Sequence, residues 1–177
     1  FNESAFYLNN IKQLSNTLKK VKYKKIVLFG VSYALLDFAE KYPIKMKNLI
    51  VIETGGMKGR KKEISRDELH QKLQNGFGVE NIHSEYGMTE LFSQAYAIKN
   101  GKFKNPPWMK TFIRDINNPL LVSKKGKGAI NIIDLANEHS CAFIATEDLG
   151  EVFENNNYSI IGRMTESEIR GCNQMFN

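Results

Sequence analysis

Cysteine is scarce in this sequence, and long apolar runs are missing from it. Only two of the 177 residues are cysteines, Cys141 and Cys172, which argues against a disulfide framework and against a cysteine-based metal cluster. The low count predicts a reducing, cytoplasmic setting. The best apolar stretch, residues 25–33, is far shorter than the roughly 20 residues that a membrane-spanning helix needs, and it is typical of a buried strand. We therefore expect no membrane span.

Acidic residues are outnumbered by basic ones. Lysine and arginine together number 25 against 19 aspartates and glutamates, which gives a formal net charge of +6. The acidic residues are dispersed and there is no dedicated basic arm, so a nucleic-acid partner is permitted by the charge but not implied. With 42% hydrophobic residues, the chain is neither disordered nor fibrous, and it is long enough for one core or two small ones.

The first hundred residues alternate between helix and strand patterns, which is typical of a parallel α/β sheet. Continuous apolar runs over residues 25–30 and 48–53 predict strands that are buried on both faces. Four helices are expected around them: residues 2–20, residues 32–42, a helix from the capping box of Ser65 and Glu68 to residue 73, and one beginning near residues 86–90.

After residue 98, glycine, asparagine and proline punctuate short alternating runs. The runs at residues 111–116, 129–135, 142–146 and 158–161 predict antiparallel strands. The expected fold class is therefore α/β, with a parallel-sheet α/β part followed by a β-rich, barrel-like part. We divide the chain into an α/β subdomain (1–100), which carries the glycine turns, and a β-rich subdomain (101–177), with residues 100–107 as connector.

Two glycine-bearing turns follow predicted strands of the α/β part, where open sheets expose backbone N–H groups to ligands. In Thr54-Gly55-Gly56-Met57 the backbone could approach a flat ring or a phosphate, although such a turn needs no ligand. In Tyr86-Gly87-Met88-Thr89-Glu90 a hydroxyl and a carboxylate could address a phosphate oxygen and its Mg²⁺. The alternative is that Thr89 caps a helix, with Glu90 favourable to the helix dipole.

Two polar turns lie in the β-rich part. Within Thr146-Glu147-Asp148-Leu149-Gly150, Asp148 could accept hydrogen bonds from the two hydroxyls of a ribose, while the plain alternative is a β-turn. Arg163 follows Gly162 at the end of a short apolar run. Its guanidinium could contact a phosphate or a ribose, or simply lie exposed after a strand.

The order of these four motifs resembles the adenylate-forming superfamily of acyl-CoA synthetases, luciferases and acyl-protein synthetases. The resemblance extends from about residue 25 to residue 171, and Tyr-Gly-x-Thr-Glu is its most specific motif. The stretch from Gly162 to Cys172 is most similar to the acyl-protein synthetase of the bacterial bioluminescence fatty-acid reductase complex. This resemblance implies an acid–thiol ligase that uses ATP and Mg²⁺ to activate a long-chain fatty acid as acyl-AMP, and a reductase partner that takes the acyl group.

The resemblance also implies a role for each motif residue. The adenine would be lined by Gly55, Gly56 and Met57, with Tyr86 stacked on it and Gly87 letting the backbone approach. Thr89 would bind the α-phosphate and Glu90 the Mg²⁺. Asp148 would hold the ribose, Arg163 would contact ribose or phosphate, and Cys172 would accept the acyl group.

The sequence departs from the superfamily pattern in three places. The Ser/Thr/Gly-rich phosphate loop normally found upstream is absent, and so is the downstream domain whose lysine completes adenylation. We therefore expect a C-terminal portion that is inactive in isolation. Glu147 also stands where many relatives carry glycine.

Two other functions are retained as alternatives. A CoA ligase of the phenylacetate type would keep the adenylation and hand the acyl group to coenzyme A. A non-catalytic basic module would bind a partner through its excess lysines. No aromatic-rich strand of the RNA-stacking type is present, so we expect no nucleic-acid partner.

Overall fold

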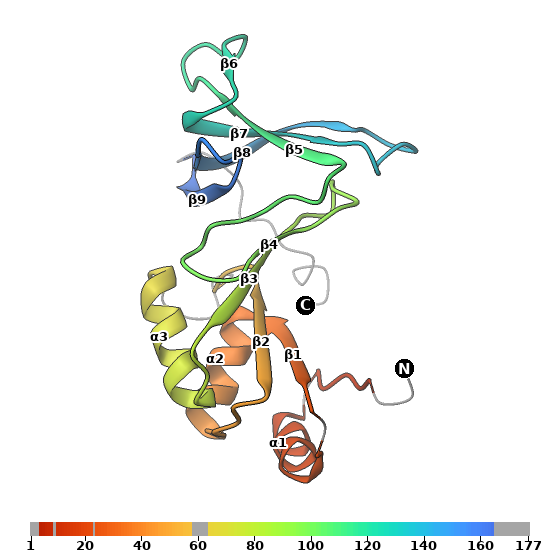
Figure 1. The fold of residues 1–177 in the computed structure, drawn as a ribbon, viewed down its shortest axis with the longest axis vertical. Coiled ribbons are helices and arrows are strands. Elements are labelled where there is room, and N and C mark those ends of the chain that lie inside the picture. Colours follow the sequence, from red (N-terminus) through yellow and green to blue (C-terminus); the bar gives the residue numbers. More distant parts are fainter. Residues whose placement is uncertain (1–3, 9, 23, 58–63, 165–177) are drawn as a thin grey trace.

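Two β-sheets follow one another along the long axis of the molecule, and the helices lie beside the first of them (Figure 1). The computed structural model describes residues 4–8, 10–22, 24–57 and 64–164. The helices and the first sheet come from residues 11–97, and the second sheet comes from residues 109–163.

The first sheet has the strand order β1-β2-β3-β4. Strands β1 (Ile26–Val31), β2 (Leu49–Thr54) and β3 (Ile82–Tyr86) run parallel, and β4 (Ala95–Ala97) lies antiparallel to β3. Both strands predicted from continuous apolar runs are therefore confirmed, and they pair in parallel as an α/β fold requires.

The edge strand β1 corrects the expectation of burial on both faces. Leu28 points into the core, whereas its neighbours Val27 and Phe29 are 59% and 51% exposed. Successive side chains of a strand point to opposite faces, and the described helices pack on the face that carries Leu28. Within the described ranges, the face of β1 that carries Val27 and Phe29 is only partly covered.

The described residues form three helices, α1 (Ile11–Lys20), α2 (Ser32–Lys41) and α3 (Arg66–Phe77). The predicted capping box is confirmed, because Ser65 Oγ accepts a hydrogen bond from the Glu68 N–H at 3.1 Å. Helix α1 begins later than expected, since Asn10 caps it by accepting from the Gln13 N–H at 2.9 Å. In the described part of the chain, no helix is both long enough and apolar enough to cross a membrane.

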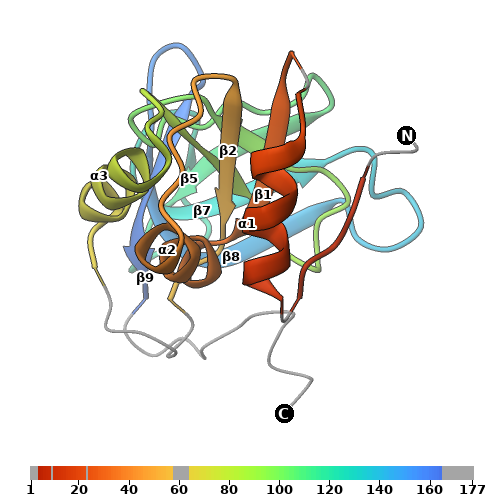
Figure 2. The same ribbon diagram turned by 90° about the horizontal axis from the view of Figure 1, so that it is seen from below.

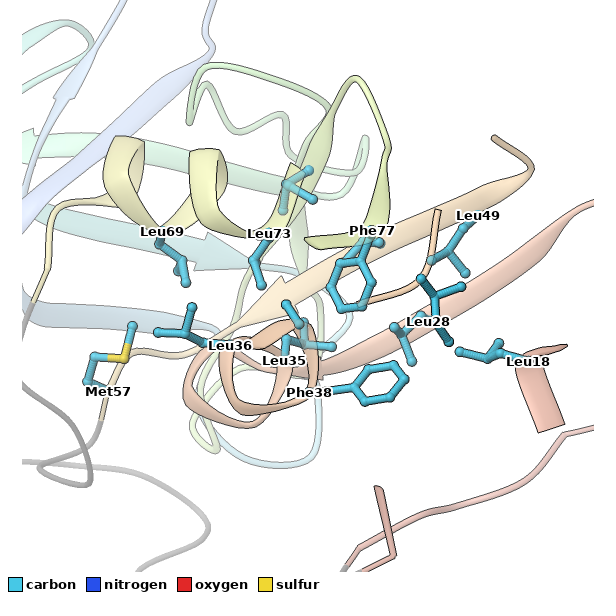
Figure 3. Close-up of a cluster of buried hydrophobic side chains, with 14 residues drawn as sticks. Leu18, Leu28, Leu35, Leu36, Phe38, Leu49, Met57, Leu69, Leu73 and Phe77 are labelled. Atoms are coloured by element: carbon cyan, nitrogen blue, oxygen red, sulfur yellow. The ribbon is translucent and has the colours of Figure 1, made fainter. Parts of the chain in front are cut away.

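The first core lies between this sheet and its helices (Figure 3). Phe77 and Leu73 of α3 are fully buried, and the Phe77 ring packs 5.6 Å from the ring of Phe38 on α2. Seen from below, α2 and α3 lie side by side (Figure 2). Leu18 joins α1 to the same cluster.

The second sheet is antiparallel, with the order β6-β5-β7-β8-β9. Its strands are β5 (Met109–Arg114), β6 (Val122–Ser123), β7 (Gly126–Asp134), β8 (Phe143–Val152) and β9 (Tyr158–Arg163). All four strands predicted for this half are thus confirmed. The barrel-like expectation is not, because the edge strands β6 and β9 do not pair and the described strands form an open sheet. β6, at two residues, is too short to close it.

The segment after β4 joins the two sheets. Isolated bridges pair Tyr96 of β4 with Lys104, and Phe103 with Tyr158 of β9. The Arg66 guanidinium of α3 lies 5.3 Å from the centre of the Phe103 ring. Phe103 and Tyr158 are both buried in a second core cluster. The two sheets therefore contact each other through buried aromatic side chains.

Candidate functional site

Three of the predicted site residues converge between the two sheets. Tyr86, the last residue of β3, donates its phenolic hydrogen to Asp148 Oδ2 at 2.6 Å, across 62 positions of sequence. On the other side of the carboxylate, Arg163 Nε lies 3.3 Å from Asp148 Oδ1. A ring hydroxyl and a guanidinium thus hold the same carboxylate, whose side chain is 15% exposed.

The register of the second sheet fixes the Asp148–Arg163 pair. Asp148 of β8 and Arg163 of β9 are direct cross-strand partners, and such neighbours lie close enough to interact. The guanidinium of Arg163 also reaches Glu147 Oε2 at 3.5 Å. The predicted β-turn at residues 146–150 is therefore wrong, because these residues lie inside β8. Glu147 adds a second acidic partner for Arg163.

Aromatic side chains enclose Tyr86. Its ring centre lies 5.8 Å from that of Phe103 and 5.8 Å from that of Tyr158, the latter pair edge to face. Burial, and then the negative charge and hydrogen bond of Asp148, raise the pKa of Tyr86 above its ordinary value. The phenol therefore stays protonated at neutral pH and keeps donating to Asp148. Sequence reasoning assigned a role to the ring of Tyr86 and missed its hydroxyl, for which no local signal exists.

The stretch after Tyr86 is a turn instead of the predicted helix. Thr89 and Glu90 lie exposed in this turn, and Leu91 N–H donates to the Met88 carbonyl at 3.1 Å. The next backbone N–H groups bind a side chain from another strand: those of Phe92 and Ser93 donate to Asp134 Oδ2 at 2.9 and 2.7 Å. With this carboxylate from β7 accepting their hydrogens, no helical turn forms. The alternative that Thr89 caps a helix is therefore wrong as well.

Asp134 is the buried anchor of that turn. It is fully buried, and besides the two N–H groups it accepts from Ser93 Oγ at 2.7 Å and from the Ala136 N–H at 3.2 Å. The Asn137 side chain adds a bond to the Glu90 carbonyl at 2.9 Å. The position of the Thr89–Glu90 turn is thus set by the end of β7, more than forty positions along the chain.

The first glycine turn follows β2. Gly55 has a left-handed φ of 70°, which L side chains rarely adopt. A Cβ added at Gly56 would meet no described residue within 4 Å, so among the described residues a ligand could approach the backbone there. The Met57 side chain is 2% exposed and belongs to the first core, so only its backbone can face such a ligand. At Gly87, an added Cβ would lie 3.1 Å from Gln94.

A buried polar cluster supports the glycine turn, and sequence reasoning missed it. Glu53, at 4% exposure, accepts from Ser32 Oγ at 2.6 Å, and the same Oγ lies 3.0 Å from the Gly55 carbonyl oxygen. His70 Nε2 lies 3.5 Å from Glu53 and 3.2 Å from Ser84 Oγ.

Hydrogen bonding outweighs burial at Glu53. Burial by itself would raise the pKa of this carboxyl, but hydrogen bonds from His70, Ser32 and Ser84 and the charge of His70 bring it below its ordinary value. The signal was available in the alternation of β2, in which Leu49, Val51 and Glu53 all take inward positions.

Two predicted roles concern Mg²⁺ binding by Glu90 and acyl transfer to Cys172. The structure describes no group of three or more His, Cys, Asp or Glu side chains within its ranges that could hold a metal ion. A lone carboxylate such as Glu90 fits Mg²⁺ only together with substrate phosphates, which is the usual arrangement for this ion. Cys172, the predicted acyl acceptor, lies outside the described residues.

Comparison with known families decides the relationship that the motifs suggest. The family described as acyl-protein synthetase, LuxE, matches residues 3–177. The chain belongs to this family. No curated protein matches it.

Solved structures share the fold of this family member. Coronafacic acid ligase from Pectobacterium brasiliense is 19% identical, with a TM-score of 0.60 over 89% of this chain and 33% of its own. ATP-bound MatB from Rhodopseudomonas palustris is 16% identical, with a TM-score of 0.59 over 86% of this chain and 33% of its own.

A luciferase-like enzyme from the mealworm Zophobas morio gives 18% identity and a TM-score of 0.61 over 89% of this chain and 41% of its own. The family match thus confirms the resemblance to acyl-protein synthetases, and these solved structures show a shared fold. The chain spans about a third of the length of coronafacic acid ligase and of MatB.

Proposed function

We propose that this chain is the nucleotide-proximal part of an ATP-dependent acyl-protein synthetase. In the proposed reaction the carboxylate oxygen of a long-chain fatty acid attacks the α-phosphorus of ATP, and pyrophosphate leaves. The resulting acyl-AMP then loses AMP as a cysteine thiolate attacks its carbonyl carbon. Both steps depend on positioning and on neutralising charge.

The convergence of Tyr86, Asp148 and Arg163 is the observation that carries this proposal. Three motif residues from distant parts of the sequence meet at one carboxylate. Asp148 is held in place by both neighbours, so it is preorganised to accept hydrogen bonds from two ribose hydroxyls. The Arg163 guanidinium beside it can pair with a phosphate oxygen.

The glycine turns supply the remaining contacts in this proposal. Among the described residues, the space over Gly56 is open, so a flat adenine could approach the backbone of residues 55–57 there. At Gly87 the Gln94 side chain lies close to the backbone, so in this proposal it moves aside when adenine approaches beside the ring of Tyr86. Thr89 and Glu90 lie exposed in the adjacent turn. There Thr89 would donate to the α-phosphate and Glu90 would ligate the Mg²⁺ that neutralises it.

We further propose Cys172 as the acyl acceptor, in a cytoplasmic protein that passes the acyl group to a reductase partner. Coenzyme A is the competing acceptor, and it is favoured by the likeness in fold to ligases, among them a benzoate CoA ligase from Burkholderia xenovorans with a TM-score of 0.55. The two acceptors predict different products for a Cys172→Ser variant. Protein labelling is lost with acyl-AMP retained if Cys172 is the acceptor, whereas thioester output persists if coenzyme A is.

The decisive experiment uses the full-length parent protein, ATP, Mg²⁺ and a labelled long-chain fatty acid. Acyl-AMP is quantified, and hydroxylamine-sensitive label is mapped by peptide mass spectrometry. Glu90→Ala and Asp148→Asn are each expected to lower acyl-AMP formation by about 100-fold or more, since each removes charge stabilisation or positioning. Glu80→Ala removes an exposed carboxylate that precedes β3, at the end of the strand opposite Tyr86, and serves as the matched control. Full activity of both site variants would contradict the proposal.

A further inference from the structure

An open groove lies beside the Thr89–Glu90 turn, and none of the motifs accounts for it. It has a volume of about 870 Å³ and is formed by residues 92–108 with contributions from Ala136 and Asn157. Most of its surface is apolar. It is separate from the Tyr86–Asp148 contact, because neither residue lines it.

Large hydrophobic side chains of this groove face solvent. Phe92 is 71% exposed, Ile98 is 67% exposed and Trp108 is 52% exposed. Single exposed hydrophobics are ordinary, but several gathered in one hollow mark an interaction site. A pocket usually encloses most of the surface of a small ligand. The side chains that line this groove are too exposed to enclose a small ligand in that way. The shape therefore fits a segment of another protein.

Trp108 is held in place although half of it is exposed. Its indole N–H donates to Ser93 Oγ at 2.8 Å, and that hydroxyl donates to the buried Asp134 carboxylate at 2.7 Å. The exposed indole is thus tied to the interior of the second sheet. A fixed aromatic side chain loses little conformational entropy on binding, which is typical of residues that dominate interface energies.

The charge of the groove is of one sign. Lys99, Lys102 and Lys104 line it, and no aspartate or glutamate is among its described lining residues. Lys102 Nζ lies 5.0 Å from the centre of the Phe153 ring. A cationic rim around an apolar floor is complementary to a segment with acidic residues flanking apolar ones.

We propose that this groove docks an acidic, amphipathic segment of a partner protein, with its apolar side chains against Trp108 and Phe92 and its carboxylates toward Lys99 and Lys104. The Ser93–Asp134 link places this docking site directly beside the Thr89–Glu90 turn, since Asp134 holds both. The inference goes beyond the proposed function and does not depend on nucleotide binding.

Trp108 is the only tryptophan in the chain, so its fluorescence reports on the groove directly. The 177-residue chain is titrated, without nucleotide, with a short amphipathic peptide of leucine and glutamate. A peptide with lysine in place of glutamate is the comparison. The acidic peptide is expected to give a saturable blue shift that weakens as salt shortens the Debye length, and the lysine peptide none.

Charge reversal at the rim tests the same point. Lys99→Glu combined with Lys104→Glu is expected to weaken acidic-peptide binding by roughly fivefold. Lys47→Glu with Lys124→Glu changes net charge equally at exposed positions outside the groove, and should leave affinity unchanged.

Three results would overturn the inference: equal binding of both peptides, equal weakening by both lysine pairs, or a Trp108 response to dodecanoate with none to the acidic peptide. Because no ATP is present, such a failure would leave the adenylation proposal untouched.

Discussion

The two sheets present their polar side chains in different ways. In the first sheet the polar side chains gather where parallel strands end, as Glu53 and Tyr86 do. In the second sheet they lie in paired positions across antiparallel strands, as Asp148 and Arg163 do. The first arrangement follows from the direction of the strands, while the second depends on register. The candidate site forms only where the two arrangements meet, at the Tyr86–Asp148 hydrogen bond.

The largest expected loss of stability comes from emptying either core, and it tests whether the two sheets unfold as one unit. Phe77→Ala empties the first core and Phe103→Ala the second, and each is expected to lower the free energy of unfolding by about 3–5 kcal/mol. Because Phe103 packs against Tyr86 of the first sheet, both variants should weaken one common transition in urea unfolding. The exposed Phe92→Ala is the control, with a change under about 0.5 kcal/mol. Two separate transitions would show that the sheets are independent.

A second, smaller effect concerns the anchor that only the second sheet provides. Asp134→Ala leaves the N–H groups of Phe92 and Ser93 without their buried acceptor, and is expected to lower the free energy of unfolding by about 3 kcal/mol. Trp108 emission should change as well, since its hydrogen-bond chain ends on Asp134. Asp115→Ala removes an aspartate that accepts from backbone N–H groups in an exposed turn, and should have a smaller effect. Equal losses would argue against the anchor.

The pH dependence of stability in a Glu53→Gln variant tests the buried polar cluster of the first sheet. The folded-state pKa of Glu53 is lowered, so its stabilising contribution is present above the unfolded pKa near 4.5 and is lost as pH falls through the folded value. Glu53→Gln should therefore reduce the free energy of unfolding by about 1–3 kcal/mol at pH 7, and the difference should shrink below pH 4.5. Urea unfolding at several pH values measures it. Exposed Glu80→Gln is the control, and a pH-independent difference would contradict the assignment.

The smallest expected effect falls on the contact that joins the sheets. Tyr86→Phe removes the hydrogen bond to Asp148 and should reduce the free energy of unfolding by about 1 kcal/mol at pH 7. Because the pKa of Tyr86 is raised above 10.0, this contribution is present below pH 10 and declines as pH rises above it. Tyr96→Phe removes an exposed hydrogen bond to Glu85 and should change stability less. A Tyr86→Phe variant as stable as the parent chain would mean that Asp148 is held by Arg163 alone.

Much of the first sheet could be predicted from the sequence, because its signals are local. Continuous apolar runs identified β1 and β2, and the capping box of Ser65 and Glu68 located the start of α3. The failure at residues 86–90 has a clear cause. A helix-start pattern was overridden by Asp134, a distant carboxylate whose contacts are invisible in the local sequence.

In the second sheet, local patterns predicted the strands but not the way they assemble. Alternating patterns located its four main strands, but nothing local indicates whether the edges of a sheet pair, and the expected barrel is an open sheet. The exposed face of β1 has the same origin, because an apolar run does not reveal which side a helix will cover. The groove at Trp108 likewise arises from segments that approach only in the folded chain.

Local sequence was enough to predict the strand and helix periodicities, the glycine turn at Gly55, and the order of motifs whose family the match over residues 3–177 shows. These depend on backbone preferences and on side chains a few positions apart. Three features depend on the folded chain: Tyr86 donates to Asp148, Asp148 pairs with Arg163, and the contacts of Asp134 hold a turn where a helix was expected. Each of these contacts joins residues far apart in the chain, so it exists only once strand register and sheet packing bring the partners within hydrogen-bonding distance.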